Sequence, residues 1–189
     1  MRAFDYILEK RILWNQTNGQ FGAYIVAHNM SWGWPGNPAN HQTFVNYITD
    51  MGNAGIISVG ATDNNPNLEI NETNDIPTSI LNPFLINVTS TNNRDVRFGA
   101  YGASRIHLGA PGINVLTATG TNGYTSGSGG TSFAAPMVAG TVGLMYVAAS
   151  EELLNSFMNN PGDLAQMVKQ YILEGVDPVS SLSDVTTTG

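Results

Sequence analysis

The protein has 189 residues, of which 42% are hydrophobic and only 11% are charged. These fractions indicate a globular domain whose polar surface is mostly uncharged. The formal net charge of −7 argues against nucleic acid as a partner, because such sites need clustered Lys and Arg. The absence of cysteine excludes disulfides and a cysteine nucleophile. One proline and two glycines interrupt the longest apolar run, 133–149, so we also expect no membrane span.

Helices and strands are expected to alternate along the first part of the chain. Residues 4–13 have the apolar spacing of an amphipathic helix and do not resemble a signal peptide. Residues 23–30 are typical of a short buried strand. After a Gly- and Pro-rich loop at 32–40, a second amphipathic helix is predicted at 41–51 and another buried strand at 56–61.

The same alternation continues in the second part. The further predicted elements are a polar stretch at 62–81, strands at 84–90, 105–108 and 113–116, a Gly-Ala-Pro-Gly turn at 109–112, a Gly-rich segment at 122–130, and helices at 132–149 and 163–173. This order predicts an α/β fold with a mostly parallel central sheet and helices on both faces. Sites in such sheets form beyond the carboxyl ends of the strands, where the loops at Trp32 and Asn64 begin.

The most informative segment is 129–140, Gly-Gly-Thr-Ser-Phe-Ala-Ala-Pro-Met-Val-Ala-Gly. It places Ser132 at the start of an apolar helix, where backbone N–H groups have no intrahelical acceptor and can bind developing negative charge. The preceding glycines allow a close approach of another backbone. Pro136 is expected to be tolerated because it falls near the first turn. A serine at a helix start is ordinarily an N-cap, so the position alone does not make Ser132 a nucleophile.

The whole string resembles the nucleophile motif of the subtilisin-like serine proteases, Gly-Thr-Ser-x-Ala-x-Pro-x-Val-x-Gly, and it matches at every fixed position. Further resemblances run through the chain, in a style most similar to secreted subtilases of marine Bacteroidetes. The matching segments are Asn-Met-Ser-Trp-Gly at 29–33, the strand and loop at 55–65, Pro-Thr-Ser at 77–79, Phe-Gly-Ala-Tyr-Gly at 98–102 and Ala-Pro-Gly at 110–112.

This resemblance implies a function for several residues. It implies that Ser132 is the nucleophile and that Asn64 completes the oxyanion hole, with Asn53 and Asn65 as alternatives to Asn64. It implies an extended substrate peptide bound along two loops. The substrate-binding residues expected from the resemblance are Ser31, Trp32, Gly33, Ala61, Thr62 and Asp63.

The other two residues of a Ser-His-Asp triad are not found in the sequence. His28, His41 and His107 all lack the context that the family's catalytic histidine has, and no Asp lies in the family's strand-end motif. We therefore expect the triad Asp and His to lie upstream of residue 1. On this interpretation residues 1–189 are a partial catalytic domain, truncated at both ends and inactive alone, whose partner is the missing N-terminal half.

The resemblance thus predicts a secreted endopeptidase that cleaves proteins through an acyl-enzyme. The alternative is a catalytically dead subtilase-fold binding module. No cofactor is expected, and although calcium is common in the family, no calcium-binding loop is visible. Met137 stands where many relatives have a histidine that is not the triad base, so we expect this difference to affect packing only.

Overall fold

A computed structural model describes residues 2–189. The elements in chain order are α1 (Arg2–Gln16), β1 (Ala27–Met30), the short 3-10 helix η1 (Pro38–Asn40), α2 (Gln42–Asn53), β2 (Ile57–Ala61), β3 (Leu85–Thr91), β4 (Leu108–Pro111), β5 (Val115–Thr119), β6 (Gly123–Ser128), α3 (Thr131–Ala148), α4 (Glu151–Ser156) and α5 (Pro161–Glu174). Helices and strands alternate as the sequence predicts, and the differences lie mainly at β4, α4 and the hairpin.

Four parallel strands form the central sheet in the order β1-β2-β3-β4. Every residue of β2 and β3 is buried, as expected for strands of a parallel sheet covered on both faces, and the buried residues include polar ones such as Ser58, Asn87 and Thr89. Because the strands are parallel, their carboxyl ends lie at one edge of the sheet, where the loops after β1 and β2 begin. This edge is where the candidate site forms.

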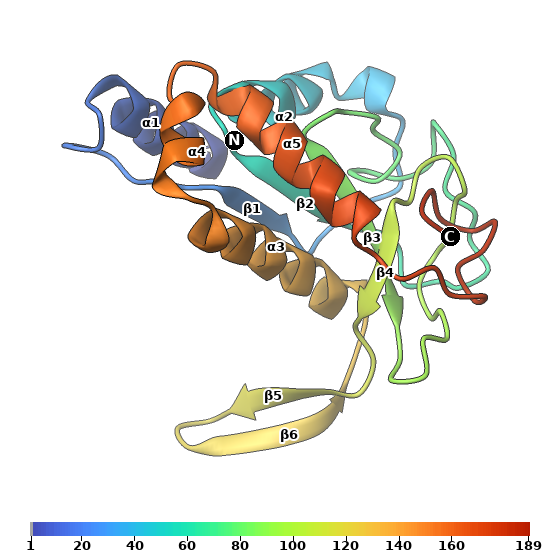
Figure 1. Cartoon of the computed structure of the whole chain (residues 1–189). Coiled ribbons are helices and arrows are strands. Elements are labelled where there is room, and N and C mark those ends of the chain that lie inside the picture. Colours follow the sequence, from blue (N-terminus) through green and yellow to red (C-terminus); the bar gives the residue numbers. More distant parts are fainter. Residues whose placement is uncertain (1) are drawn as a thin grey trace.

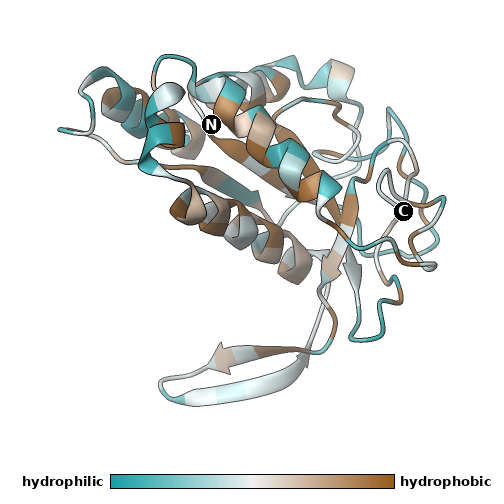
Figure 2. Ribbon diagram, viewed as in Figure 1, coloured by the Kyte–Doolittle hydropathy of each residue, from teal (hydrophilic) through white to brown (hydrophobic). Residues whose placement is uncertain are grey.

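Helices cover both faces of the sheet (Figure 1). Successive side chains of a strand point to opposite faces, and in β3 Leu85 belongs to a different apolar cluster from Ile86. The cluster of Ile86 includes residues of α3 and α5, whereas the cluster of Leu85 includes residues of α2 with Phe4 of α1 packed against it. The apolar residues concentrate where helices meet the sheet (Figure 2). The predicted α/β fold class is confirmed.

Helix α3 is continuous through Pro136, Gly140 and Gly143, in agreement with the helix predicted at 132–149. Among residues 2–189, α3 is the one helix that is long and apolar enough to cross a membrane, with 18 residues and a mean hydropathy of 1.4. Its residues Ala135 and Val142 are buried in the core cluster that includes β2 and β3. The central helix of a folded domain meets the same two criteria of length and composition.

The segment predicted as a Gly-Ala-Pro-Gly turn is mostly strand β4, which pairs with β3 from Leu108 opposite Val88 to Pro111 opposite Thr91. Pro111 is compatible with this strand because it lies at the end of an edge strand, where its missing N–H removes no ladder bond. The predicted Gly-rich segment contains β6, which pairs with β5 as an antiparallel hairpin that projects from the body of the molecule (Figure 1).

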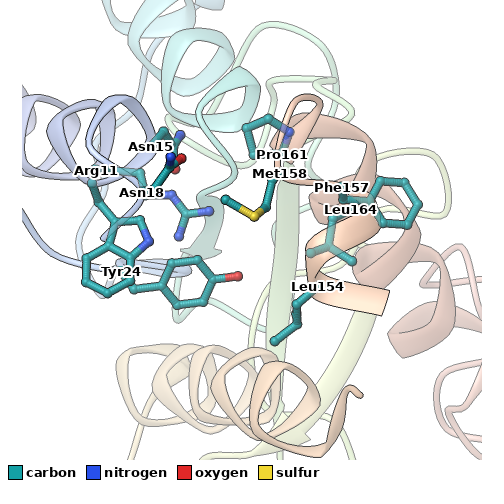
Figure 3. Close-up of a pocket in the computed structure, with 10 residues that line it drawn as sticks. Arg11, Asn15, Asn18, Tyr24, Leu154, Phe157, Met158, Pro161 and Leu164 are labelled. Atoms are coloured by element: carbon teal, nitrogen blue, oxygen red, sulfur yellow. The ribbon is translucent and has the colours of Figure 1, made fainter. Parts of the chain in front are cut away.

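A buried arginine joins α1 to the neighbouring elements (Figure 3). The Arg11 side chain is only 2% exposed. Its Nε donates to the Ala54 carbonyl at 3.0 Å, its Nη1 donates to the Ile25 carbonyl at 3.0 Å, and its guanidinium lies 4.1 Å from the centre of the Tyr24 ring. Burial lowers the pKa of Arg11. These contacts position α1 against the end of α2 and the segment that leads into β1.

Candidate active site

The candidate site is a hollow of about 430 Å³, open to solvent, between the loops after β1 and β2 and the start of α3. Its lining residues are Trp32, Gly33, Trp34, Pro35, Ala61, Thr62, Asp63, Asn64, Asp75, Thr131 and Ser132. The structure therefore brings together both residues predicted for catalysis and five of the six predicted for substrate binding. The sixth, Ser31, contacts Ser132 directly.

Ser132 is not the N-cap of α3. The cap is Gly130, whose φ of 142° favours glycine, and Ser132 is the second residue of the helix. The capping hydrogen bond comes from another loop: Asn64 Oδ1 accepts from the Thr131 backbone N–H at 2.9 Å and lies 3.2 Å from the Thr131 hydroxyl. The Thr131 hydroxyl also donates to the Thr62 carbonyl at 2.5 Å. These bonds fix the β2 loop to the start of α3.

Two hydrogen-bond donors of residues that line the hollow with the Ser132 hydroxyl remain free. With Asn64 Oδ1 bound to Thr131, the Nδ2 group of the same amide donates no hydrogen bond within residues 2–189. The backbone N–H of Ser132 is also without an acceptor in this part of the chain. Asn53 lies in the last turn of α2, and the Asn65 side chain accepts from the Asn67 backbone N–H, so neither makes the contact with α3 that Asn64 makes.

Ser31 and Ser132 bind each other through two hydrogen bonds. The Ser132 hydroxyl donates to the Ser31 carbonyl at 3.2 Å, and the Ser31 hydroxyl donates to the Ser132 carbonyl at 2.8 Å. The second bond explains why Pro136 is tolerated. Pro136 is the sixth residue of the helix, and its missing N–H leaves the Ser132 carbonyl without its intrahelical donor. The predicted reason, a position near the first turn, is wrong, since Ser31 supplies the donor that Pro136 lacks.

Comparison with known proteins assigns the chain to a family. Residues 5–174 match the model of the subtilase family of peptidases. The chain is a subtilase. It is 34% identical over 129 residues to an extracellular basic protease of Dichelobacter nodosus, an alignment that covers 65% of this chain and 20% of that protein.

Solved structures share the subtilase fold at lower identity. A cold-adapted subtilisin-like serine proteinase superposes with a TM-score of 0.61 at 23% identity, over 95% of this chain and 57% of that one. The subtilase cytotoxin SubAB superposes with a TM-score of 0.68 at 21% identity, over all of this chain and 60% of that one. The chain thus spans about a fifth of the curated relative and under two thirds of these structures.

Four lining residues of this subtilase were not predicted from the sequence, namely Trp34, Pro35, Asp75 and Thr131. Among these, Asp75 carries a carboxylate. Its side chain is only 4% exposed and accepts a hydrogen bond from the Thr78 hydroxyl. Burial raises the pKa of Asp75, and the nearby charge of Asp63 raises it further. The available signal was its position two residues before the Pro-Thr-Ser segment at 77–79, which resembles the family.

None of the three histidines lines the hollow. His28 lies on β1 with its ring 5.0 Å from that of Phe4, and burial lowers its pKa to about 4. His41 precedes α2 and lies against Trp34. His107 accepts the Asn87 backbone N–H at Nδ1, at 2.9 Å, and burial lowers its pKa to about 3, with the charge of Lys169 adding to the effect. Each histidine thus occupies a structural position.

The described residues also offer no cluster of metal ligands, since residues 2–189 contain no group of three or more His, Cys, Asp or Glu side chains placed to hold an ion. Met137 is 47% exposed on the outer side of α3, away from the hollow. Hydrogen-bond donors, a hydroxyl and carboxylates are therefore the chemical groups that this subtilase chain itself brings to the site.

Proposed function

We propose that this chain carries the nucleophile and oxyanion hole of a secreted serine endopeptidase. The observation that supports this most strongly is the Ser132 hydroxyl at the start of α3, with its own N–H and the Asn64 Nδ2 group as free donors in the same hollow. The name of the extracellular relative supports secretion. The low content of Lys and Arg argues against a nucleic-acid substrate.

In the proposed reaction, Ser132 Oγ attacks the carbonyl carbon of a peptide bond and its proton passes to a general base. The carbonyl oxygen becomes an oxyanion, which the Ser132 N–H and Asn64 Nδ2 stabilise. Collapse of this intermediate breaks the C–N bond, the amine leaves with the proton, and an acyl-enzyme remains. Water then releases the acyl group by the same steps. No cofactor is required at any step.

The general base and its carboxylate are proposed to come from a polypeptide segment outside residues 1–189. No strand within residues 2–189 pairs with the outer edge of β1, and an unpaired edge is a template for another strand. On the outer side of α3, Leu144 and Val147 are 69% and 83% exposed, which leaves an apolar surface for the same segment to cover. β1 ends beside Ser31, so a segment at this edge approaches Ser132.

The test is covalent labelling of the full-length protein with a fluorophosphonate, which reacts with activated serine hydroxyls. We expect labelling of the wild type and none of Ser132→Ala, because the hydroxyl that attacks phosphorus is removed. Ser128→Ala, at the end of the β6 strand, is the matched control and keeps full labelling. Equal labelling of wild type and Ser132→Ala would show that Ser132 is not the nucleophile. A wild type that folds but is never labelled would favour the binding-module alternative.

A further inference from the structure

The hollow beside Ser132 carries negative charge that the proposed peptide cleavage does not use. Among its lining residues Asp63 and Asp75 bear carboxylates, and none is basic. Two of the other lining residues are tryptophans, and the indole rings of Trp32 and Trp34 stack with their centres 5.6 Å apart and their planes within 6°. The result is a polar, acidic cavity with flat aromatic walls, directly next to the proposed nucleophile.

Asp75 is held in this cavity by well-defined contacts. Trp34 and Ile76 pair through two backbone hydrogen bonds of 3.0 and 2.9 Å, which place Asp75 against the loop that follows β1. The backbone N–H of Asp75 donates to Ser79 Oγ at 2.9 Å, and its carboxylate accepts from the Thr78 hydroxyl. The carboxylate is therefore fixed in one position and not free to turn toward solvent.

No cation of the described chain balances this carboxylate. The single ion pair within residues 2–189 joins Arg105 to Glu72. Asp75, which is only 4% exposed, therefore has no Lys, Arg or His partner among these residues. A buried, unpaired charge is costly. A cationic group that enters the hollow would remove that cost and gain a charge-assisted hydrogen bond.

We infer that this hollow takes a lysine or arginine side chain, namely that of the substrate residue whose carbonyl carbon Ser132 attacks, with Asp75 accepting hydrogen bonds from its charged end. This inference rests on the proposed function, since it assumes cleavage at Ser132. The aliphatic stem and charged end of such a side chain also suit the indole walls, which attract cations and pack against methylene groups. Asp63 adds to the negative potential near the opening.

The experiment compares pairs of peptide substrates that differ only in charge at this residue: arginine against its neutral isostere citrulline, and lysine against norleucine. With the full-length protein, we expect kcat/KM to favour arginine over citrulline by on the order of 10- to 100-fold, the range that one hydrogen bond to a charged group gives. In Asp75→Asn, which keeps the shape and the acceptor for Thr78, the ratio should fall to near one. Asp177→Asn, which removes an exposed carboxylate after α5, should keep the wild-type ratio.

Failure of this inference is separable from failure of the proposed function. If the wild type is labelled by fluorophosphonate but cleaves after citrulline as well as after arginine, or if Asp75→Asn keeps the ratio, the charge selectivity is refuted while the nucleophile stands. If Asp75→Asn does not fold, the wild type alone decides: benzamidine should slow fluorophosphonate labelling and neutral benzamide should not. Equal effects of the two compounds would overturn the inference.

Discussion

Asn64 shows how one side chain can serve both the structure and the proposed chemistry. Its carbonyl oxygen replaces the side-chain cap that Gly130 cannot provide to α3. Because that oxygen is fixed by Thr131, the amide cannot rotate freely, and its N–H₂ group has no acceptor within residues 2–189. A donor fixed before the substrate arrives stabilises a developing oxyanion without a reorganisation cost.

Replacement of Asn64 should therefore slow catalysis strongly. We expect Asn64→Ala to reduce kcat of the full-length protein by about 10² to 10³, the loss known for removal of one such donor in subtilisin. KM should change little, because the lost interaction forms mainly in the transition state. Asn65→Ala is the matched control, since this neighbouring amide binds only its own loop. Equal losses in the two variants would contradict the assignment of Asn64.

His107 is expected to contribute to the sensitivity of the fold to acid. Its Nδ1 accepts a backbone N–H of β3, so protonation at this atom places two donors against each other. The pKa of about 3 in the folded state lies below the ordinary value of 6.5. The neutral ring therefore stabilises the fold above pH 6.5, and that stability is lost as the pH falls from 6.5 toward 3.

The expected loss is measurable by urea unfolding at pH 6.5 and pH 5. Over this interval the wild type should lose about 2 kcal/mol more free energy of unfolding than His107→Asn, whose Oδ1 keeps the acceptor but takes up no proton. His28 titrates in both proteins, so its contribution cancels. The control variant is His41→Asn, at the N-cap of α2. Over the same pH interval it should lose as much free energy of unfolding as the wild type. Identical losses for the wild type and His107→Asn would show that His107 does not control acid stability.

At the scale of elements, strong periodic patterns predicted most of the fold. The apolar run that contains β2 and the helical spacing of α2 and α5 are local properties, so the sequence determines them directly. The start of α3 was also predictable, because its glycines and small residues match a specific motif. The predicted 23–30 strand is shorter in the structure, since β1 begins only where pairing with β2 begins, at Ala27.

Other features depend on contacts between distant parts of the chain, and the sequence alone could not show them. β4 contains Gly109 and Pro111, which locally favour a turn, but pairing with β3 keeps the segment extended. Asp75 is an ordinary polar residue in a polar stretch until the pairing of Trp34 with Ile76 brings it into the hollow. The donor that replaces the missing N–H of Pro136 lies 105 positions earlier, at Ser31.

At the scale of the whole molecule, the proposed site has donors and a nucleophile but no base. The three histidines lie outside the hollow, and among residues 2–189 β1 has one unpaired edge. The Ser132 hydroxyl instead donates to the Ser31 carbonyl, which cannot take up its proton. Residues 1–189 alone are thus expected to bind peptides weakly and to cleave them at a negligible rate.

This expectation can be tested by complementation. Residues 1–189 alone should have a kcat lower than that of the full-length protein by on the order of 10⁶, the loss known in subtilisin when the catalytic histidine is removed. Addition of the separately purified remainder of the catalytic domain should restore cleavage, because its strands would pair with β1 and bring the base to Ser132. The same mixture made with Ser132→Ala should stay inactive. Cleavage by residues 1–189 alone at the full-length rate would mean that the base lies within this chain, and the division of the triad proposed above would be wrong.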